Sequence, residues 1–235
     1  MFTETAQYYD LLYSTIKDYA REVPEIAAML RRLHPQVRTI LDVGCGTGEH
    51  ARRLAAEGFA VDGIDLDPVF VRIAAQKHPA GTFTIADMAD FHLGRTYDAV
   101  LCLFSSIGYL RTLDRVDSAL QCFREHVTAG GVILVEPWFP PGFMTDGFVM
   151  RNEAADESVR IVRDARTEID GRISRLHFDY EIADADGIRH TRETHELGLF
   201  TVEEQLGAFE RAGLEARFEP AGFCDRGLLV ASPSG

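Results

Sequence analysis

Three glycines in one short segment are the residues whose type and spacing point most directly to ligand chemistry. The segment LDVGCGTGEH places Gly44, Gly46 and Gly48 between a predicted strand and a predicted helix. Glycines in such a turn let the backbone approach a ligand closely at the end of a strand. Asp65 follows at the end of the next predicted strand, at about the twenty-residue interval where an acidic side chain meets a ribose hydroxyl in dinucleotide folds. The loop and this acid together predict a site for a cofactor that contains adenosine.

The charge that follows the loop favours one kind of cofactor. Glu49 puts an anion in the first turn of a helix, where the pyrophosphate of a dinucleotide would lie and be repelled. S-Adenosylmethionine has no phosphate and carries a sulfonium cation, so Glu49 and Asp42 are compatible with it. Asp87 and Met88, after the third predicted strand, offer an acceptor for an adenine amino group and an apolar contact for the ring. We therefore expect S-adenosylmethionine, although Asp87 could also cap a turn and Met88 could be core.

The elements that must position these residues alternate along the first part of the chain. Strands are expected at 39–43, 60–66, 82–88, 97–104 and 130–138, and helices at 18–33, 49–59, 69–78 and 114–127. Strands that alternate with helices in this way predict an α/β fold with a doubly wound, mostly parallel, Rossmann-like sheet. The carboxyl ends of the central strands then meet at one crevice, which brings the glycine loop and Asp65 together.

The period of the pattern changes after Pro141. Within residues 172–182, Leu176, Phe178, Tyr180 and Ile182 alternate with polar residues, as in a strand with one buried face, and Asp-Gly pairs at 170–171 and 186–187 mark turns. A helix at 201–213 and strands at 214–220 and 226–232 then return to the main sheet. We expect a cofactor domain of residues 1–147 and 200–235, with an N-terminal helical lid and a small antiparallel β insertion at 148–199.

Composition excludes several classes of function. The chain has 235 residues and a net charge of −13, and no run of Lys or Arg provides the basic surface that nucleic acid needs. The start MFTETAQYYD lacks the features of a signal peptide, and no apolar run is long enough to span a bilayer. We expect a cytoplasmic protein with neither nucleic acid nor membrane as a partner.

Cysteine and histidine spacing predicts neither a disulfide nor a metal. The four cysteines have no CxxC pair and are expected to be free thiols: Cys45, Cys102, Cys122 and Cys224. His190 and His195 are five residues apart in an apparent strand, so they would face opposite sides of a sheet. We predict no metal.

These motifs resemble class I S-adenosylmethionine-dependent methyltransferases over residues 38–138. Over nearly the whole chain, YDLLYSTIKDYAREV, FHLGRTYDAVLCLFSSIGYL, VEPW and the late insertion resemble the enzymes that dimethylate the amino group of dTDP-linked 3-amino-3,6-dideoxyhexoses in antibiotic biosynthesis. The resemblance implies N-methylation of a nucleotide-linked amino sugar by direct displacement.

The resemblance also implies roles for individual residues. Tyr13 and Tyr109 match positions near the amino group, and some relatives have histidine in place of Tyr109. A phenol titrates near pH 10 and is a poor base at neutral pH, so we expect Tyr109 to orient the acceptor or to carry protons through a water. An aromatic side chain that only packs at the start of a helix is the alternative.

Further contacts are expected on both sides of the crevice. Tyr13 and Tyr19 belong to a segment that would fold over the cofactor, although Tyr19 also fits a core position. Arg226 matches an arginine that would bind the diphosphate, with a surface arginine in a hairpin turn as the alternative. The expected cofactor contacts are Tyr13, Tyr19, Gly44, Gly46, Asp65, Leu66, Asp87, Met88 and Leu103, and Trp138 and Phe139 would form the wall of the sugar or base pocket.

Two other functions stay open at this point. One is O-methylation of another small metabolite, which is less favoured because hydroxyl acceptors usually need a base or a metal. The other is a non-catalytic module that binds a nucleotide or S-adenosylmethionine. The antiparallel insertion could form either a lid or a homodimer surface.

Overall fold

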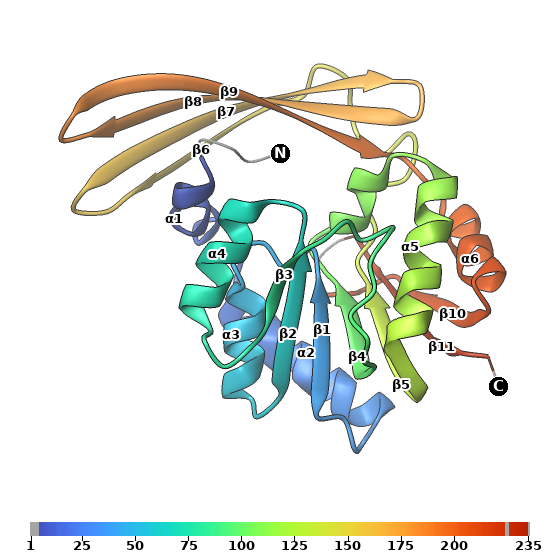
Figure 1. The fold of residues 1–235 in the computed structure, drawn as a ribbon. Coiled ribbons are helices and arrows are strands. Elements are labelled where there is room, and N and C mark those ends of the chain that lie inside the picture. Colours follow the sequence, from blue (N-terminus) through green and yellow to red (C-terminus); the bar gives the residue numbers. More distant parts are fainter. Residues whose placement is uncertain (1–4, 224–225, 235) are drawn as a thin grey trace.

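The computed structural model describes residues 5–223 and 226–234. It contains two sheets, one mostly parallel and flanked by helices, the other antiparallel and lying across the top of the first (Figure 1). The helical elements are η1 (Ala6–Tyr8), α1 (Tyr9–Tyr13), α2 (Tyr19–Leu33), α3 (Glu49–Ala56), α4 (Pro68–Lys77), η2 (Ser106–Leu110), α5 (Leu113–His126) and α6 (Val202–Arg211). The strands are β1 (Thr39–Val43), β2 (Ala60–Asp65), β3 (Phe83–Ile85), β4 (Tyr97–Cys102), β5 (Val127–Val135), β6 (Val149–Ala155), β7 (Val159–Asp170), β8 (Ile173–Asp184), β9 (Gly187–Gly198), β10 (Leu214–Glu219) and β11 (Leu228–Pro233).

The main sheet confirms the predicted doubly wound architecture. Its strand order is β10-β11-β5-β4-β1-β2-β3. Strands β1 to β5 pair in parallel, whereas β11 pairs antiparallel with both β5 and β10. The chain leaves β1 toward β2 on one side and later returns to β4 on the other, so the switch point lies between β1 and β4. Ligands bind at this point in open α/β sheets.

The two faces of the parallel sheet explain its apolar sequence. Leu41 faces a core cluster that includes Phe123 of α5 and Phe209 of α6, while the neighbouring Ile40 faces a second cluster that includes Leu30 of α2. All five side chains are almost fully buried. Because helices cover both faces, consecutive residues of the central strands are buried rather than every second one.

The antiparallel sheet has the order β6-β7-β8-β9 and spans Val149–Gly198. Its inner face buries Phe178, Tyr180 and Ile182 against Leu12 of α1, as the alternating pattern in β8 predicts. The short helix α1 therefore lies beneath this sheet and above the parallel one (Figure 1). The division of the chain into two domains stays a prediction.

The fourth strand is shorter than the sequence predicts. β4 ends at Cys102, and the predicted strand residues Leu103 and Phe104 belong to the loop that follows. Phe104 and Ser105 have left-handed backbone conformations, with φ of 52° and 64°. Two hydrogen bonds hold this turn against the end of β5, because the Phe104 amide donates to Glu136 Oε2 at 2.5 Å and Ser105 Oγ donates to the Pro137 carbonyl at 2.7 Å. β3 is also shorter, so Asp87 and Met88 lie in a loop.

Candidate active site

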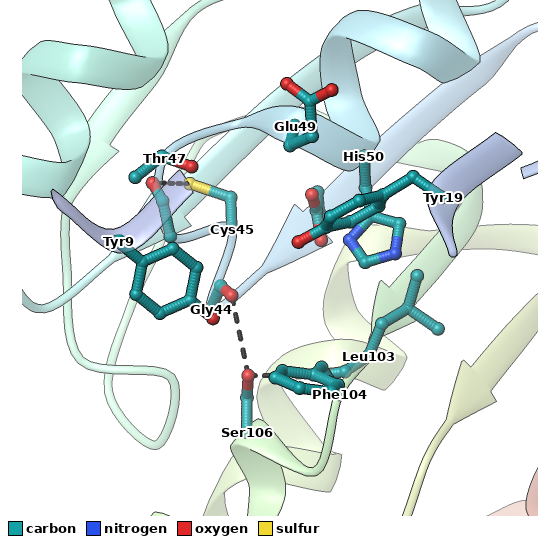
Figure 2. A pocket seen from close by; sticks show the side chains of 12 residues that line it. Tyr9, Tyr19, Gly44, Cys45, Thr47, Glu49, His50, Leu103, Phe104 and Ser106 are labelled. Carbon is teal, nitrogen blue, oxygen red and sulfur yellow. Dashed lines mark hydrogen bonds between the residues drawn. The ribbon is translucent and has the colours of Figure 1, made fainter. Parts of the chain in front are cut away.

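A cleft of about 910 Å³ opens between the carboxyl edge of the parallel sheet and the inner face of the antiparallel sheet. A small pocket of about 40 Å³ adjoins it at the glycine loop (Figure 2). The pocket and the cleft share Tyr9, Gly44, Gly46, Phe104 and Ser106. Every predicted site residue lines one of the two: Tyr13, Tyr19, Gly44, Gly46, Asp65, Leu66, Asp87, Met88, Leu103, Tyr109, Trp138, Phe139 and Arg226. The structure thus brings the predicted residues together, and their individual roles stay predictions.

The glycine loop forms the floor where the cleft and the pocket meet. Gly44 has a φ of 70°, and a Cβ there would lie 2.8 Å from the Ser106 side chain. Gly46 has a φ of 53°, and a Cβ there would meet nothing within 4 Å. Its amide donates to Asp65 Oδ2 at 2.8 Å, so the carboxylate holds the loop at the end of β2. The loop therefore needs glycine for its backbone and leaves open space for a ligand.

Asp65 and Leu66 form the rim next to α4. Asp65 Oδ1 accepts a hydrogen bond from the Asp67 amide at 2.9 Å, and burial raises the pKa of its carboxyl. A carboxylate has about four lone-pair positions, so Asp65 can still accept from a ribose hydroxyl. Leu66 is 52% exposed and lines the cleft, as does Met88. These apolar groups suit the flat face of an adenine ring.

Asp87 is more engaged than the sequence suggests. Both of its oxygens bind Arg115 Nη2 of α5, at 2.9 and 2.6 Å, and Oδ1 also accepts from the Ala89 amide. Burial raises the pKa of Asp87, but the Ala89 amide and Arg115 outweigh burial and leave the pKa lowered. The remaining acceptor capacity is on Oδ2, so a bond to an adenine amino group would share this oxygen with Arg115.

The small pocket contains a buried carboxylate oxygen that calls for a cation. Within the described part of the chain, Asp42 Oδ2 is buried and has no hydrogen-bond partner. Burial raises the pKa of this carboxyl to about 6. Buried polar atoms are nearly always satisfied, so an orphan of this kind marks the place of a missing partner. The ammonium group in the methionyl part of S-adenosylmethionine has the required charge and donors.

The charge of Glu49 discriminates less between cofactors than the sequence suggests, because neighbouring cations bind it. Its carboxylate binds Arg52 and Arg53, each at 2.6 Å, and lies 3.4 Å from Lys77 Nζ. Burial acts to raise its pKa, but these cations lower it to about 2. Glu49 is therefore a neutralised anion, and Asp42 provides the stronger argument for a cationic ligand.

A buried cluster of charged and polar side chains that the sequence did not reveal joins the start of α2 to α3, which follows the glycine loop. Glu22 Oε1 lies 3.0 Å from both Lys17 Nζ and His50 Nε2. Lys17 Nζ also lies 4.1 Å from the centre of the Phe104 ring. Tyr19 packs edge-on against His50, with ring centres 5.0 Å apart, and lines the pocket beside it (Figure 2). This cluster fixes the start of α2 over the pocket, where Tyr19 can cover a cofactor.

Tyr13 enters the cleft from α1. Its ring stacks on Tyr9 at 4.1 Å and meets Phe104 edge-on at 5.6 Å. Its hydroxyl accepts a hydrogen bond from Arg163 Nη1 of β7 at 3.0 Å. Arg163 is only 3% exposed, and sequence reasoning missed it. The buried guanidinium fixes the hydroxyl of Tyr13 at the wall of the cleft.

Tyr109, in η2, faces the same cleft and is 41% exposed to it. Its hydroxyl lies 2.9 Å from Nδ1 of His195. Desolvation within the cleft, together with nearby phenols and carboxylates, raises the pKa of Tyr109 well above its usual value. The phenol therefore stays protonated at neutral pH even more completely than the sequence suggests, so Tyr109 alone does not provide a general base. His195 is almost fully buried and His190 is exposed, so they face opposite sides as expected, but sequence reasoning considered His195 only as a metal ligand.

A cationic group with aromatic neighbours lies at one wall of the cleft. The Arg226 guanidinium carbon is 5.1 Å from the Phe104 ring centre, 5.4 Å from that of Trp138 and 5.2 Å from that of Phe139. Trp138 Nε1 donates to Ser174 Oγ at 2.8 Å, which fixes the indole against β8. Arg226 is thus a cleft residue rather than a surface arginine. The neighbouring positions 224–225, including Cys224, lie outside the described residues.

The described residues contain neither a cluster that could hold a metal nor a helix that could span a membrane. No group of three or more His, Cys, Asp or Glu in them could hold a metal ion. None of the helices in the same residues is long and apolar enough to cross a membrane.

Comparison with known proteins connects this cleft to an activity. Residues 40–131 match a family model described as a methyltransferase domain. Over 98% of its length, the chain is 39% identical to the dTDP-3-amino-3,6-dideoxy-alpha-D-glucopyranose N,N-dimethyltransferase of Streptomyces fradiae, of which it covers 91%. It is 36% identical over 97% of its length to the dTDP-3-amino-3,4,6-trideoxy-alpha-D-glucopyranose N,N-dimethyltransferase of Streptomyces venezuelae, of which it covers 98%.

Solved structures agree with these sequence matches. The crystal structure of DesVI from Streptomyces venezuelae has a TM-score of 0.92 and 35% identity, with 99% of each chain covered. The structure of an amino pentose methyltransferase from Micromonospora echinaspora, with S-adenosylmethionine bound, has a TM-score of 0.86 and 33% identity over 96% of each chain.

The similarity spans the antiparallel sheet as well as the cofactor-binding sheet, and it confirms the fold, the enzyme class and the cofactor expected from the sequence. It also excludes a non-catalytic binding module. The chain belongs to the family of S-adenosylmethionine-dependent methyltransferases that includes the dTDP-amino-sugar N,N-dimethyltransferases.

Proposed function

We propose that this enzyme methylates the amino group of a dTDP-linked amino sugar, of the 3-amino-3,6-dideoxyhexose type, in the biosynthesis of an antibiotic sugar. The similar enzymes of Streptomyces carry such substrates in their names. The observation that carries the proposal is the position of Arg226 among aromatic rings in the same cleft as Tyr13 and Tyr109. One cleft thus offers a cation for a diphosphate and hydroxyls for an amine.

The cofactor end of the cleft suits S-adenosylmethionine. Asp42 would receive its ammonium group, Asp65 its ribose hydroxyls, and Leu66 and Met88 its adenine ring. When bound, the cofactor supplies an electrophilic methyl carbon on a sulfonium, which an amine attacks directly with loss of the neutral thioether. Most of the rate gain in such a displacement comes from alignment, which can contribute several kcal/mol, or about 7–11 kcal/mol in the best cases.

The acceptor end has two tasks, to hold the amine in line and to have it unprotonated. Tyr13 and Tyr109 would hold the amino group through their hydroxyls. Arg163 donates to the oxygen of Tyr13, and the Tyr13 hydroxyl, as a donor as well as an acceptor, would donate to a sugar oxygen. An amine is mostly ammonium at neutral pH, so the site also needs a route for its proton.

The remaining length of the cleft fits the nucleotide. Arg226 would bind the diphosphate, since a guanidinium fork matches phosphate oxygens. Phe139 lines the cleft near Arg226, and Phe143, which is not a lining residue, stacks on it with ring centres 4.5 Å apart and planes inclined by only 4°. Phe148 and Met150, which also line the cleft, are largely exposed. This apolar arm would take the thymidine moiety by stacking and burial.

Mass spectrometry after incubation with S-adenosylmethionine tests the proposal. The substrates should include dTDP-3-amino-3,6-dideoxyglucose and the matched sugar with a hydroxyl at carbon 3. We expect the amino sugar to gain one or two methyl groups and the hydroxyl sugar none. A methyl group on the hydroxyl sugar, with no mass change for any amine, would instead establish O-methylation.

A further inference from the structure

A hydrogen-bonded chain of side chains runs from the cleft into the antiparallel sheet. The Tyr109 hydroxyl lies 2.9 Å from His195 Nδ1, and His195 Nε2 lies 3.4 Å from Glu193 Oε2. Glu193 Oε1 in turn accepts from Thr5 Oγ1 at 2.8 Å. Glu193 and His195 are two residues apart in β9, so both side chains lie on its buried face. Of these four hydrogen-bonded side chains, only Tyr109 is substantially exposed to the cleft.

The carboxylate sets the direction of these hydrogen bonds. Burial acts to raise the pKa of Glu193, but His195 and Thr5 outweigh burial and lower it, so Glu193 is ionised and can only accept. His195 Nε2 must therefore carry the proton that it shares with Glu193. Burial lowers the pKa of His195, so the ring is neutral at pH 7 and Nδ1 carries no proton. Nδ1 then accepts the Tyr109 hydroxyl proton, which leaves the lone pairs of the Tyr109 oxygen facing the cleft.

We propose that Tyr109, His195 and Glu193 form a proton relay that removes the proton from the acceptor ammonium before methyl transfer. The relay rests on the proposed function, because it needs an amine acceptor. Tyr109 touches the substrate, whereas His195 and Glu193 act through it. A tyrosine is a poor base by itself. Through His195, Tyr109 would act as the general base that a histidine at position 109 could be directly.

Each proton in the step is accounted for. The ammonium N–H bond breaks as its proton moves to the Tyr109 oxygen, and the Tyr109 O–H bond breaks as that proton moves to His195 Nδ1. The amine becomes neutral and the imidazole becomes cationic beside the ionised Glu193. Tyr109 ends with one proton, as it began, so no tyrosinate forms. When the product leaves, the imidazolium returns its proton through Tyr109 to water in the cleft.

Charged and titratable groups of the surrounding elements support this assignment. Among the described residues, those that act on Tyr109 or His195 include Tyr13 of α1, Asp65 of β2, Arg163 of β7, Tyr180 of β8 and Glu193 of β9. Arg163 disfavours the imidazolium, and Glu193 stabilises it. The ring of His195 also packs on Phe178, with centres 5.1 Å apart. The imidazole is thus held in one orientation and stays a neutral acceptor until a proton arrives.

The test compares turnover of the amino sugar by the wild type with that of Tyr109→Phe, His195→Gln and Glu193→Gln, between pH 7 and 9. General-base catalysis contributes about 10²-fold or more, so we expect turnover at pH 7 to fall about 100-fold in Tyr109→Phe and His195→Gln. The double variant that combines Tyr109→Phe with His195→Gln should be no slower than either single variant, because Tyr109 and His195 act as a unit. The defect should shrink toward pH 9, since the fraction of free amine rises about tenfold per pH unit.

A matched control is available on the same sheet. His177 of β8 also binds a glutamate, with Nε2 3.0 Å from Glu168 Oε2, but it lies outside the residues that line the cleft. His177→Gln should keep the wild-type turnover and pH profile. Scanning fluorimetry and S-adenosylhomocysteine binding will show that each variant is folded. A loss of turnover that is equal at pH 7 and pH 9 would indicate a packing role and overturn the relay.

A second measurement does not depend on turnover. Nitrogen NMR of the histidine rings should give His195 as a neutral imidazole protonated at Nε2 at pH 7. Protonation at Nδ1 would reverse the hydrogen bond to Tyr109 and overturn the relay. If the wild type methylates the amino sugar and the Tyr109→Phe and His195→Gln variants keep the same turnover, the relay is overturned but the proposed function is not. Failure of the wild type to methylate any amine would overturn the proposed function and the relay with it.

Discussion

Replacing Asp42 with asparagine should move protein stability and cofactor affinity in opposite directions. The change keeps the shape of the side chain and removes its charge. Asp42 is 2% exposed, and its Oδ2 has no hydrogen-bond partner in the described residues. Because burial raises its pKa, the folded protein loses stability as the pH rises from the usual pKa of 3.8 through about 6, where Asp42 ionises.

The structure gives the size of both effects. Raising a carboxyl pKa from 3.8 to about 6 costs about 3 kcal/mol at pH 7. A buried amide recovers only part of this, so we expect Asp42→Asn to stabilise the ligand-free protein by about 1–2 kcal/mol. A hydrogen bond to a charged group contributes about 1.5–3 kcal/mol, so the same variant should bind S-adenosylhomocysteine about 10- to 100-fold more weakly. This ligand shares the ammonium group of the cofactor but cannot react.

Calorimetric titration with S-adenosylhomocysteine between pH 5 and 7 measures this effect. A carboxylate with a pKa of about 6 predicts that wild-type affinity falls about tenfold from pH 7 to pH 5, whereas Asp42→Asn should change much less. Asp164, an exposed residue of β7 paired with Arg151, provides the control, and Asp164→Asn should bind as the wild type does. Equal affinity of Asp42→Asn and the wild type at pH 7 would refute the ammonium contact.

Three further substitutions test other parts of the structure. Gly48→Ala would put a Cβ 2.8 Å from the Ala74 Cβ, at a residue with a φ of 74°. Chemical denaturation should show a loss of about 1–3 kcal/mol in the free energy of unfolding. An unchanged midpoint would contradict this packing. Arg226→Lys keeps the charge but loses the planar fork and its aromatic contacts. Steady-state kinetics should give an increase of about tenfold or more in KM for the nucleotide sugar, and calorimetry should give an unchanged Kd for S-adenosylhomocysteine; a rise in Kd instead would place Arg226 at the cofactor. Thr201→Ala breaks the capping box with Glu204 at the start of α6, and urea unfolding should show a cost of about 1 kcal/mol, against no change if the cap is dispensable.

The features that sequence predicts well here have local signals. The glycine loop and the acid at the end of β2 each depend on residues close together in the chain, and the structure has both. The alternating pattern of β8 likewise predicts its buried face. Periodicity also places the central strands of the parallel sheet to within a few residues.

The features that sequence misses are contacts between distant segments. Arg163 meets Tyr13 across 150 residues, and His195 meets Tyr109 across 86. No local pattern marks either pair, because the antiparallel sheet brings β7 and β9 over the cleft only after folding. The early end of β4 was missed for a related reason: Phe104 is bulky and apolar, yet contacts with the segment after β5 hold it in a left-handed conformation that favours glycine.

Transfer of a methyl group to nitrogen on a nucleotide-linked sugar can be observed in the product itself. Incubation of the enzyme with dTDP-3-amino-3,6-dideoxyglucose and S-adenosylmethionine labelled with carbon-13 in its methyl group tests this most directly. Proton–carbon NMR of the product should correlate the labelled methyl group with the sugar carbon that bears the nitrogen, with the dTDP group intact. A labelled methyl group on a ring hydroxyl, or no labelled product, would show that the enzyme does not N-methylate this sugar.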